Sequence, residues 1–261
     1  MLARMHVAVV IPALDEEDSI GKVVRELTEA VAAARLPLED APPRVTVLVA
    51  DNGSRDRTAA VAAGAGAYVV PAPRRGYGSA CLAALDALPA DADVVLFADG
   101  DGSDDPGDVP ALLEPVARGE AELCIGSRAL GEQLGLVERG ALTGPQRFGN
   151  HLATTLVRAV FGVHFSDLGP FRAITTTALK SLGMDDPDFG WTVQMQARAA
   201  ARGLKVREVP VHYRRRRAGH SKVAGNLKGS FLAGTIILRT VALESARAGL
   251  SRVSKRNLLS A

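Results

Sequence analysis

Short apolar runs alternate along the chain with segments whose apolar residues recur every three to four positions. The runs Val7–Ile11, Val45–Ala50 and Val94–Ala98 are typical of buried parallel strands. Between the first two runs, apolar side chains have the spacing of one helix face: Ile20, Val23, Val24, Leu27, Ala30 and Val31. The pattern therefore predicts a strand, a helix and a second strand at the start of the chain.

The same alternation continues to about residue 128. We predict further helices near 58–65, 80–88 and 108–118 and further strands over 67–70 and 121–125. Strands and helices that alternate with short connections are typical of an α/β fold with a doubly wound, mostly parallel sheet. The first helix lacks the Gly-x-Gly-x-x-Gly signature of dinucleotide-binding domains, so the sheet is Rossmann-like without that fingerprint.

Beyond residue 128 the pattern is looser. We predict a loop over 131–144, helices over 146–161, up to Leu182 and up to about Arg202, and a strand over 204–213. The last part carries an apolar stripe made of Leu227, Phe231, Leu232, Ile236, Leu238, Val241 and Leu243. The expected organisation is one large domain over residues 1–222 and a basic amphipathic helical appendage over residues 223–261.

Polar clusters follow four of the predicted strands, after Ile11, Ala50, Ala98 and Ile125. The carboxyl ends of parallel strands meet at one edge of the sheet, and ligands of such folds lie beyond that edge. Four loops that converge there predict a single binding site.

The third of these loops is strongly acidic, with five carboxylates in the 13 residues from Asp93 to Asp105. Asp99 and Asp101 stand at the end of a buried strand, where two carboxylates repel each other and resist desolvation. A hard divalent cation, Mg²⁺ or Mn²⁺, relieves both costs and prefers oxygen ligands. A plain acidic loop that ends in a helix cap at Asp105 is the alternative, and spacing alone leaves both open.

Composition narrows the class of protein. Apolar residues make up 47% of the 261 positions, enough for a sizeable core. The two cysteines, Cys81 and Cys124, lie in apolar segments, which predicts buried thiols in a reducing compartment. Neither a signal peptide nor an apolar run of about 18 residues is visible, so the expected location is cytoplasmic.

Charge is distributed unevenly. The section from Arg214 onward carries 11 Lys/Arg and one acid, a net charge of +10, and the remainder carries −8. A basic section on an acidic body predicts contact with an anion, such as phosphate groups or an anionic membrane face. Few aromatic residues accompany these charges, which disfavours nucleic acid.

Six motifs occur in register along the chain: Pro12-Ala-Leu-Asp-Glu-Glu17, Asp51-Asn-Gly-Ser-Arg-Asp-Arg-Thr58, Asp99-Gly-Asp101, Gly126-Ser-Arg128, Asp167–Arg172 and Arg216–Lys222. Together they resemble a family-2 glycosyltransferase and, within that family, the dolichyl- or polyprenyl-phosphate sugar synthases. The first two motifs resemble P-x-x-N-E-E and D-D-G-S-x-D-x-T, with Asp15 and Asn52 as departures. The resemblance spans about residues 6–240.

The resemblance implies a GT-A fold, a nucleotide-sugar donor and a divalent metal. The expected donor contacts are Pro12, Leu14, Glu16, Asp51, Arg75, Gly76 and Asp99, and the expected metal ligands are Asp99, Asp101 and Ser103. Asp51 is suited to accept a hydrogen bond from a base N–H of uracil or guanine, and we favour UDP over GDP. Turn and helix capping is the alternative for Asp51 and our interpretation of Asp56.

The implied reaction inverts the anomeric configuration through direct attack by the acceptor. A phosphate monoester acceptor is already anionic near neutral pH, because its second pKa is about 6, so it needs cations more than a base. We expect these cations and their neighbours to be Arg128, Arg216, Arg217, Ser221 and Lys222. Asp167 is the candidate general base or orienting group.

Three other functions stay under consideration. A glycosyltransferase with a soluble acceptor fits the same motifs. A nucleotidyltransferase normally carries a glycine-rich basic loop after the first strand; this chain has Pro-Ala-Leu-Asp-Glu-Glu there, which argues against that function. A non-catalytic binding module would not need the paired acids Asp99 and Asp101, so it is the least favoured alternative. Trp191 is expected to pack in the core, and a homo-oligomer stays open.

Overall fold

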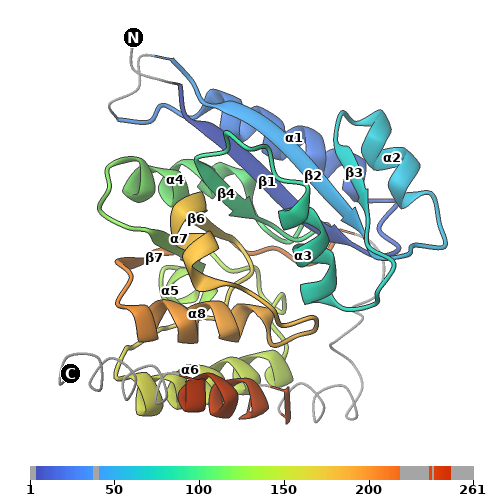
Figure 1. Cartoon of the computed structure of the whole chain (residues 1–261). Coiled ribbons are helices and arrows are strands. Elements are labelled where there is room, and N and C mark those ends of the chain that lie inside the picture. The colour runs from blue at the N-terminus through green and yellow to red at the C-terminus, as the bar shows by residue number, and fades with distance from the viewer. Residues whose placement is uncertain (1–3, 38–40, 218–234, 237, 248–261) are drawn as a thin grey trace, which may run out of the picture.

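A seven-stranded sheet forms the centre of the computed structural model, which describes residues 4–37, 41–217, 235–236 and 238–247. The strand order is β3-β2-β1-β4-β6-β5-β7 (Figure 1). The strands are β1 His6–Ala13, β2 Arg44–Asp51, β3 Tyr68–Pro71, β4 Val94–Phe97, β5 Leu123–Ser127, β6 Arg172–Thr175 and β7 Val206–Pro210. Each strand is parallel to its neighbours except β6, which is antiparallel to β4 and β5.

Helices cover both faces of the sheet, which explains why β1 and β4 are apolar along their length. One face is covered by α1 Ile20–Ala33, α2 Thr58–Gly64 and α4 Val109–Ala117, the last preceded by the short 3₁₀ helix η1 Pro106–Asp108. The other face is covered by α3 Tyr77–Asp86, α7 Thr176–Leu182 and α8 Trp191–Arg202. The doubly wound, mostly parallel sheet predicted from the sequence is confirmed.

Three boundaries differ from the prediction. The strand β6, which lies between the Asp167–Arg172 motif and the predicted helix that ends at Leu182, was not predicted, and it is the one antiparallel member of the sheet. The expected loop 131–144 begins inside the helix α5 Arg128–Gln133. The strand β7 is shorter than the predicted 204–213, although Tyr213 still makes isolated bridges to Asp104 and Val137.

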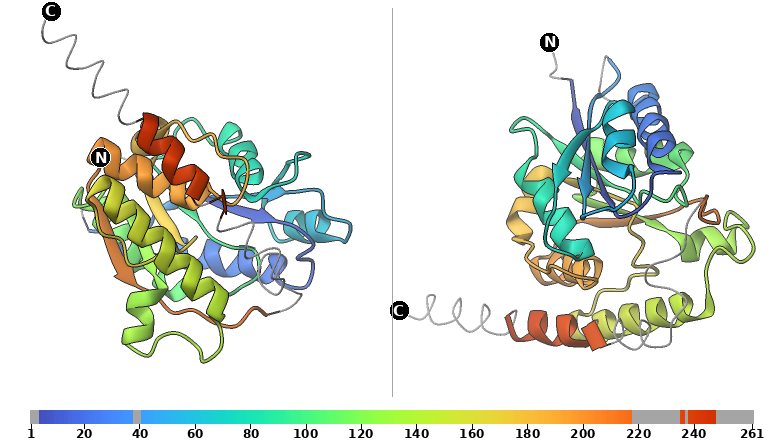
Figure 2. Two further views of the ribbon diagram at one scale, coloured as in Figure 1. Left: turned by 90° about the horizontal axis from the view of Figure 1, so that it is seen from below. Right: turned by 90° about the vertical axis from the view of Figure 1, so that its right-hand side faces the viewer.

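The helix α6 Gly144–Phe161 packs on α8 and extends the second helical layer. A capping box formed by Thr143 and Gln146 begins it, and Gly162 ends it in the left-handed conformation. Residues 238–247 are also helical and lie with α6 below α8 in Figure 1 (Figure 2 gives two further views). None of the helices described here is both long and apolar enough to cross a bilayer.

In the helical residues 238–247, some side chains of the predicted apolar stripe are buried and others are exposed. Val241 is buried in the second core cluster, whereas Leu238 and Leu243 are exposed. Glu244 is buried and pairs with Arg198 of α8 at 2.8 Å. This helix is therefore packed on the domain along one face and open along the other. The remainder of the expected appendage over 223–261 lies outside the described residues.

Candidate active site

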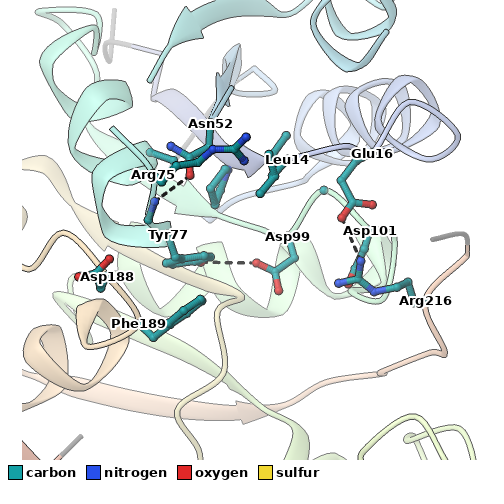
Figure 3. A pocket seen from close by; sticks show the side chains of 15 residues that line it. Leu14, Glu16, Asn52, Arg75, Tyr77, Asp99, Asp101, Asp188, Phe189 and Arg216 are labelled. Carbon is teal, nitrogen blue, oxygen red and sulfur yellow. Dashed lines mark hydrogen bonds and ion pairs between the residues drawn. The ribbon is translucent and has the colours of Figure 1, made fainter. Parts of the chain in front are cut away.

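Two adjoining cavities open beyond the carboxyl ends of the parallel strands. The first has a volume of about 460 Å³, and six of the predicted donor residues line it: Pro12, Leu14, Glu16, Arg75, Gly76 and Asp99 (Figure 3). The second has a volume of about 530 Å³ and is lined mainly from later parts of the chain, including Arg128, Thr143, Gln146, Leu168, Tyr213 and Arg215. The predicted convergence of loops at this edge is present.

Backbone hydrogen bonds join the loop after β1 to the loop after β2. The N–H of Asp15 donates to Ser54 Oγ at 3.0 Å, and the N–H of Glu16 donates to Thr58 Oγ1 at 2.8 Å. Asp15 also accepts from the N–H of Arg55 at 2.7 Å and has a φ of 49°, a conformation that Asp and Asn tolerate better than most residues. These contacts fix the floor of the first cavity.

Asn52, rather than Asp51, lies on the cavity wall. Its amide donates to the carbonyl oxygens of Ala72 and Arg74 at 2.9 and 2.6 Å, and its oxygen accepts from the N–H of Gly76 at 2.9 Å. Asn52 therefore holds the loop after β3 in place. Asp51 accepts from the N–H of Ser54 at 3.3 Å, as a turn residue does, and its predicted base contact stays a prediction.

The loop after β3 passes very close to the segment before α8. Gly76 has a φ of 133°, and a Cβ there would lie 2.2 Å from the carbonyl oxygen of Pro187. Only glycine satisfies both conditions. This approach brings Arg75 on one side and Asp188 on the other to the rim of the first cavity.

The acidic loop after β4 is buried more deeply than an ordinary surface turn. Burial, followed by the nearby charge of Asp101, raises the pKa of Asp99 to about 7. Asp104 accepts from the N–H of Asp99 at 3.0 Å, and its burial also raises its pKa. Asp105 caps η1 by accepting from the N–H of Gly107 at 3.0 Å, as the alternative interpretation predicted for that residue.

Arg216 forms a cationic bridge between two of these loops. Its Nη1 lies 2.9 Å from Glu16 Oε1 and its Nη2 lies 2.8 Å from Asp101 Oδ2 (Figure 3). The other oxygen of Asp101 accepts from the N–H of Ser103 at 2.8 Å. A cation thus already occupies the space that Glu16 and Asp101 face.

The donor set suits a divalent cation that shares its ligands with a bound substrate. Within the described part of the chain, no three His, Cys, Asp or Glu side chains form a metal-binding group by themselves. Asp99, Asp101 and the hydroxyl of Ser103 offer hard oxygen ligands, and Mg²⁺ is commonly held by one or two carboxylates together with substrate phosphates. The positions of Asp99 and Asp101 fit such an incomplete site.

Arg128 and Asp167 form a buried pair beside the second cavity. Nε and Nη2 of Arg128 lie 2.8 and 2.9 Å from the two oxygens of Asp167, whose side chain is only 2% exposed. Although burial works against it, the guanidinium of Arg128 holds the pKa of Asp167 below its usual value. Arg128 also lies over the ring of Tyr213, 5.2 Å from its centre. Both oxygens of Asp167 are bound to Arg128, and the choice between its two predicted roles, base and orienting group, stays a prediction.

Three residues predicted to bind the acceptor phosphate are still to be placed: Arg217, Ser221 and Lys222. Arg217 lines neither cavity and pairs with Glu26 of α1 at 2.9 Å, and its predicted substrate contact stays a prediction. Ser221 and Lys222 lie outside the described residues.

The model of glycosyl transferase family 2 matches residues 8–182, two thirds of the chain. This chain belongs to glycosyl transferase family 2. An uncharacterized glycosyltransferase of Mycobacterium tuberculosis is 36% identical over 234 residues, which cover 89% of this chain and 96% of that protein. Polyprenol monophosphomannose synthase of Mycolicibacterium smegmatis is 30% identical over 236 residues, which cover 84% and 81% of the two chains.

A solved structure shares the fold. Glucosyl-3-phosphoglycerate synthase of Mycobacterium tuberculosis, solved with Mn²⁺, UDP-glucose and phosphoglyceric acid, matches with a TM-score of 0.70 and 24% identity. The match covers 93% of this chain and 80% of that one. The expected GT-A fold is confirmed, and the predicted glycosyltransferase class is confirmed by the family.

Sequence reasoning missed several residues that line the site of this glycosyltransferase: Asn52, Tyr77, Asp188, Phe189 and Tyr213. Asn52 stood within a recognised motif and was judged only as a departure from it. Trp191, by contrast, is 1% exposed and packs against Phe97 with ring centres 6.2 Å apart, which confirms its expected role in the core.

Proposed function

We propose that this glycosyltransferase moves a hexose from a UDP-sugar to a polyprenyl phosphate, with inversion at the anomeric carbon. The observation that carries the proposal is the meeting of the two cavities at Asp99 and Asp101, which line both. A donor diphosphate in the first cavity and an acceptor phosphate in the second would bring the reacting atoms together at this point.

The first cavity suits the nucleotide. Its wall combines the apolar side chains of Pro12 and Leu14 with the amide of Asn52 and the cation of Arg75. A few polar groups set in an apolar wall are typical of small-molecule sites. The glucosyl-3-phosphoglycerate synthase of similar fold, solved with UDP-glucose, supports UDP over GDP as the nucleotide.

Asp99, Asp101 and Ser103 are the residues that would hold a divalent cation. When bound, Mg²⁺ or Mn²⁺ supplies charge that stabilises the leaving diphosphate. Asp101 pairs with Arg216, and Asp99 lies at the end of β4 beside the same cavity. The loop after β4 thus brings together the negative charge that such a cation requires, and the Mn²⁺ in the structure of the glucosyl-3-phosphoglycerate synthase supports the use of a divalent cation.

The second cavity suits an anionic acceptor. Among the residues that the structure describes, Arg128, Arg215 and Arg216 line it, and its only carboxylates are Asp99 and Asp101, at its border with the first cavity. Asp167 binds Nε and Nη2 of Arg128 and so holds the guanidinium at the wall of this cavity, and a phosphate monoester needs cationic donors more than it needs a base. The acceptor oxygen is therefore positioned by arginine, and no general base is required.

The choice of a lipid acceptor has support from relatives and from the surface. One relative, polyprenol monophosphomannose synthase, is named for a product in which a sugar phosphate is joined to a polyprenol lipid. Leu238 and Leu243 are exposed on the helix 238–247, and Arg239 is exposed between them. Such a face suits peripheral contact with an anionic bilayer. A soluble phosphorylated acceptor is the second candidate, favoured by the phosphoglyceric acid in the related structure.

Product analysis tests the proposed function. Purified protein with Mg²⁺ or Mn²⁺ would be given UDP- and GDP-hexoses together with a short polyprenyl phosphate or with 3-phosphoglycerate. We expect a polyprenyl phosphohexose from a UDP donor. Exclusive transfer to 3-phosphoglycerate would favour the soluble acceptor, and no transfer from any nucleotide sugar would refute the proposal.

Liposome flotation tests the membrane contact. Truncating the chain before residue 238 would strand the buried guanidinium of Arg198 without Glu244, so point variants are preferable. Arg239→Glu should weaken binding to anionic liposomes at low salt, with Leu238→Ser and Leu243→Ser acting in the same direction. Arg35→Glu, an exposed residue just after α1, is the matched control. Equal flotation of all variants would argue against this surface.

A further inference from the structure

The two cavities share five lining residues: Tyr77, Asp99, Asp101, Phe189 and Arg216. The three charged residues are accounted for by the proposed cation and phosphates. The two aromatic residues are not, although they lie where the transferred sugar has to pass from donor to acceptor. Phe189 is 39% exposed, so a large part of its ring is free to meet a ligand.

Both aromatic side chains point into the cavity toward Asp99 (Figure 3). The hydroxyl of Tyr77 donates to Asp99 Oδ1 at 3.5 Å, which leaves room for a better partner. Asp188, immediately before Phe189, is exposed and lines the first cavity. An apolar ring is thus flanked by a hydroxyl and a carboxylate.

The position of Phe189 is fixed by the start of α3. The N–H groups of Gly78 and Ser79 donate to the carbonyl oxygens of Asp188 and Pro187 at 3.2 and 2.7 Å. These N–H groups at the start of a helix have no partner within the helix, and here the segment before α8 satisfies them. Gln194 accepts from two further N–H groups of that segment. Phe189 and Tyr77 are therefore parts of one rigid wall.

We propose that Phe189 is the platform for the transferred sugar, with Tyr77 and Asp188 binding its hydroxyl groups, and that the sugar is a neutral hexopyranose. The inference rests on the proposed function. One face of a pyranose ring consists of C–H groups and packs on an aromatic ring, while its hydroxyl groups point outward to polar partners. Asp188 borders this position and is not among the residues assigned to the cation, and its charge disfavours a sugar that carries a carboxylate.

Calorimetry with UDP and UDP-glucose separates the platform from the nucleotide site. Phe189→Ala should leave the Kd of UDP within about twofold of the wild-type value and weaken UDP-glucose about tenfold, because only the sugar loses its contact. Phe189→Tyr should retain the preference for UDP-glucose, and Phe189→Leu should lose part of it. Phe148→Ala, which removes a ring that is 69% exposed on α6 outside both cavities, is the matched control.

Sugar charge provides a second readout. The wild-type protein should bind UDP-glucose at least about tenfold more tightly than UDP-glucuronic acid, and Asp188→Asn should narrow that difference. Equal weakening of UDP and UDP-glucose in Phe189→Ala, or no weakening of either, would overturn the platform while leaving the proposed function intact. A wild-type protein that binds no nucleotide would refute both.

Discussion

The first cavity is built largely from backbone contacts, whereas the second is built from paired side chains. Asn52, Thr58 and Ser54 hold the loops of the first cavity through their neighbours' N–H and carbonyl groups. The second cavity depends on ion pairs between distant residues, such as Arg128 with Asp167 and Arg215 with Glu138. Hydrogen bonds to the backbone hold the first cavity in one shape, which suits a ligand that does not change. The ion pairs of the second cavity join side chains, so a few substitutions can change the ligand that it binds.

The largest expected effect falls where the two cavities meet. Asp101→Asn keeps the size of the side chain but removes the charge that faces Arg216 and the proposed cation. We expect turnover to fall by about 10²–10³-fold and Mn²⁺ binding in the presence of UDP to weaken, with a cooperative thermal transition retained. Steady-state kinetics, calorimetry and a circular-dichroism melt measure the three quantities.

Asp105→Asn is the matched control for that variant, because Asp105 lies in the same acidic loop but caps η1 and lines neither cavity. Asn is also a good helix cap, so little change in turnover is expected. Full activity of Asp101→Asn, or of the wild-type protein in EDTA, would remove the metal from the mechanism.

The next effect isolates the second cavity. Asp167→Asn frees one donor of Arg128 and should raise the KM for the acceptor about tenfold, while the Kd of UDP stays unchanged. The pKa of Asp167 is lowered in the folded protein, so the contribution of the pair is complete above about pH 4 and is lost only as the pH falls through the folded pKa.

The acceptor KM should therefore be flat between roughly pH 6 and pH 8 in the wild-type protein, since Asp167 stays ionised there. A general base would behave differently: kcat of Asp167→Asn would collapse at every pH, and the KM would change little. That outcome would restore Asp167 to the role of base, the alternative that the sequence left open.

A smaller effect tests the backbone of the first cavity. Asn52→Ala removes three hydrogen bonds that hold the loop carrying Arg75 and Gly76, and should raise the Kd of UDP about fivefold to tenfold. Asp51→Ala should raise it less, because Asp51 does not line the cavity. Calorimetry on both variants compares them directly. A larger effect at Asp51 would establish the base contact predicted from the sequence.

The smallest effect is expected at Arg217, which the sequence placed among the substrate contacts. Arg217→Ala should change kcat and KM by less than about twofold and lower the stability by about 1 kcal/mol, since it loses a partly buried pair with Glu26. Arg216→Ala, one residue away, is the comparison and should impair turnover strongly. Similar kinetic losses in the two variants would show that both arginines reach the substrates.

The elements that were predictable share a local cause. The pattern of apolar residues within each segment predicts the strand β1 and the helix α1. The loops after β1, β2 and β4 are predicted from the positions at which those strands end. The helix α1, for example, begins at Ile20 as its apolar spacing indicates. The antiparallel strand β6 was not predictable, because its four residues become a strand only through pairing with β4 and β5.

The same distinction applies to the site. Asp99 and Asp101 were identified because their position after an apolar strand is a local signal. Phe189 and Tyr77 carry no such signal, since an aromatic residue before a helix is usually part of a core. Their place in the site results from the contact between the start of α3 and the segment before α8, which joins residues more than 100 positions apart.

Trp191 is the only tryptophan among the 261 residues, and it stands two positions after Phe189. Its ring lies against Phe97 at the end of β4, and its backbone N–H donates to the carbonyl oxygen of Asp188 at 3.4 Å. Intrinsic fluorescence excited at the indole band therefore arises from one place, between the core and the wall of the first cavity. Tryptophan fluorescence therefore reports on this wall of the first cavity without an attached label, and no other tryptophan contributes to the signal.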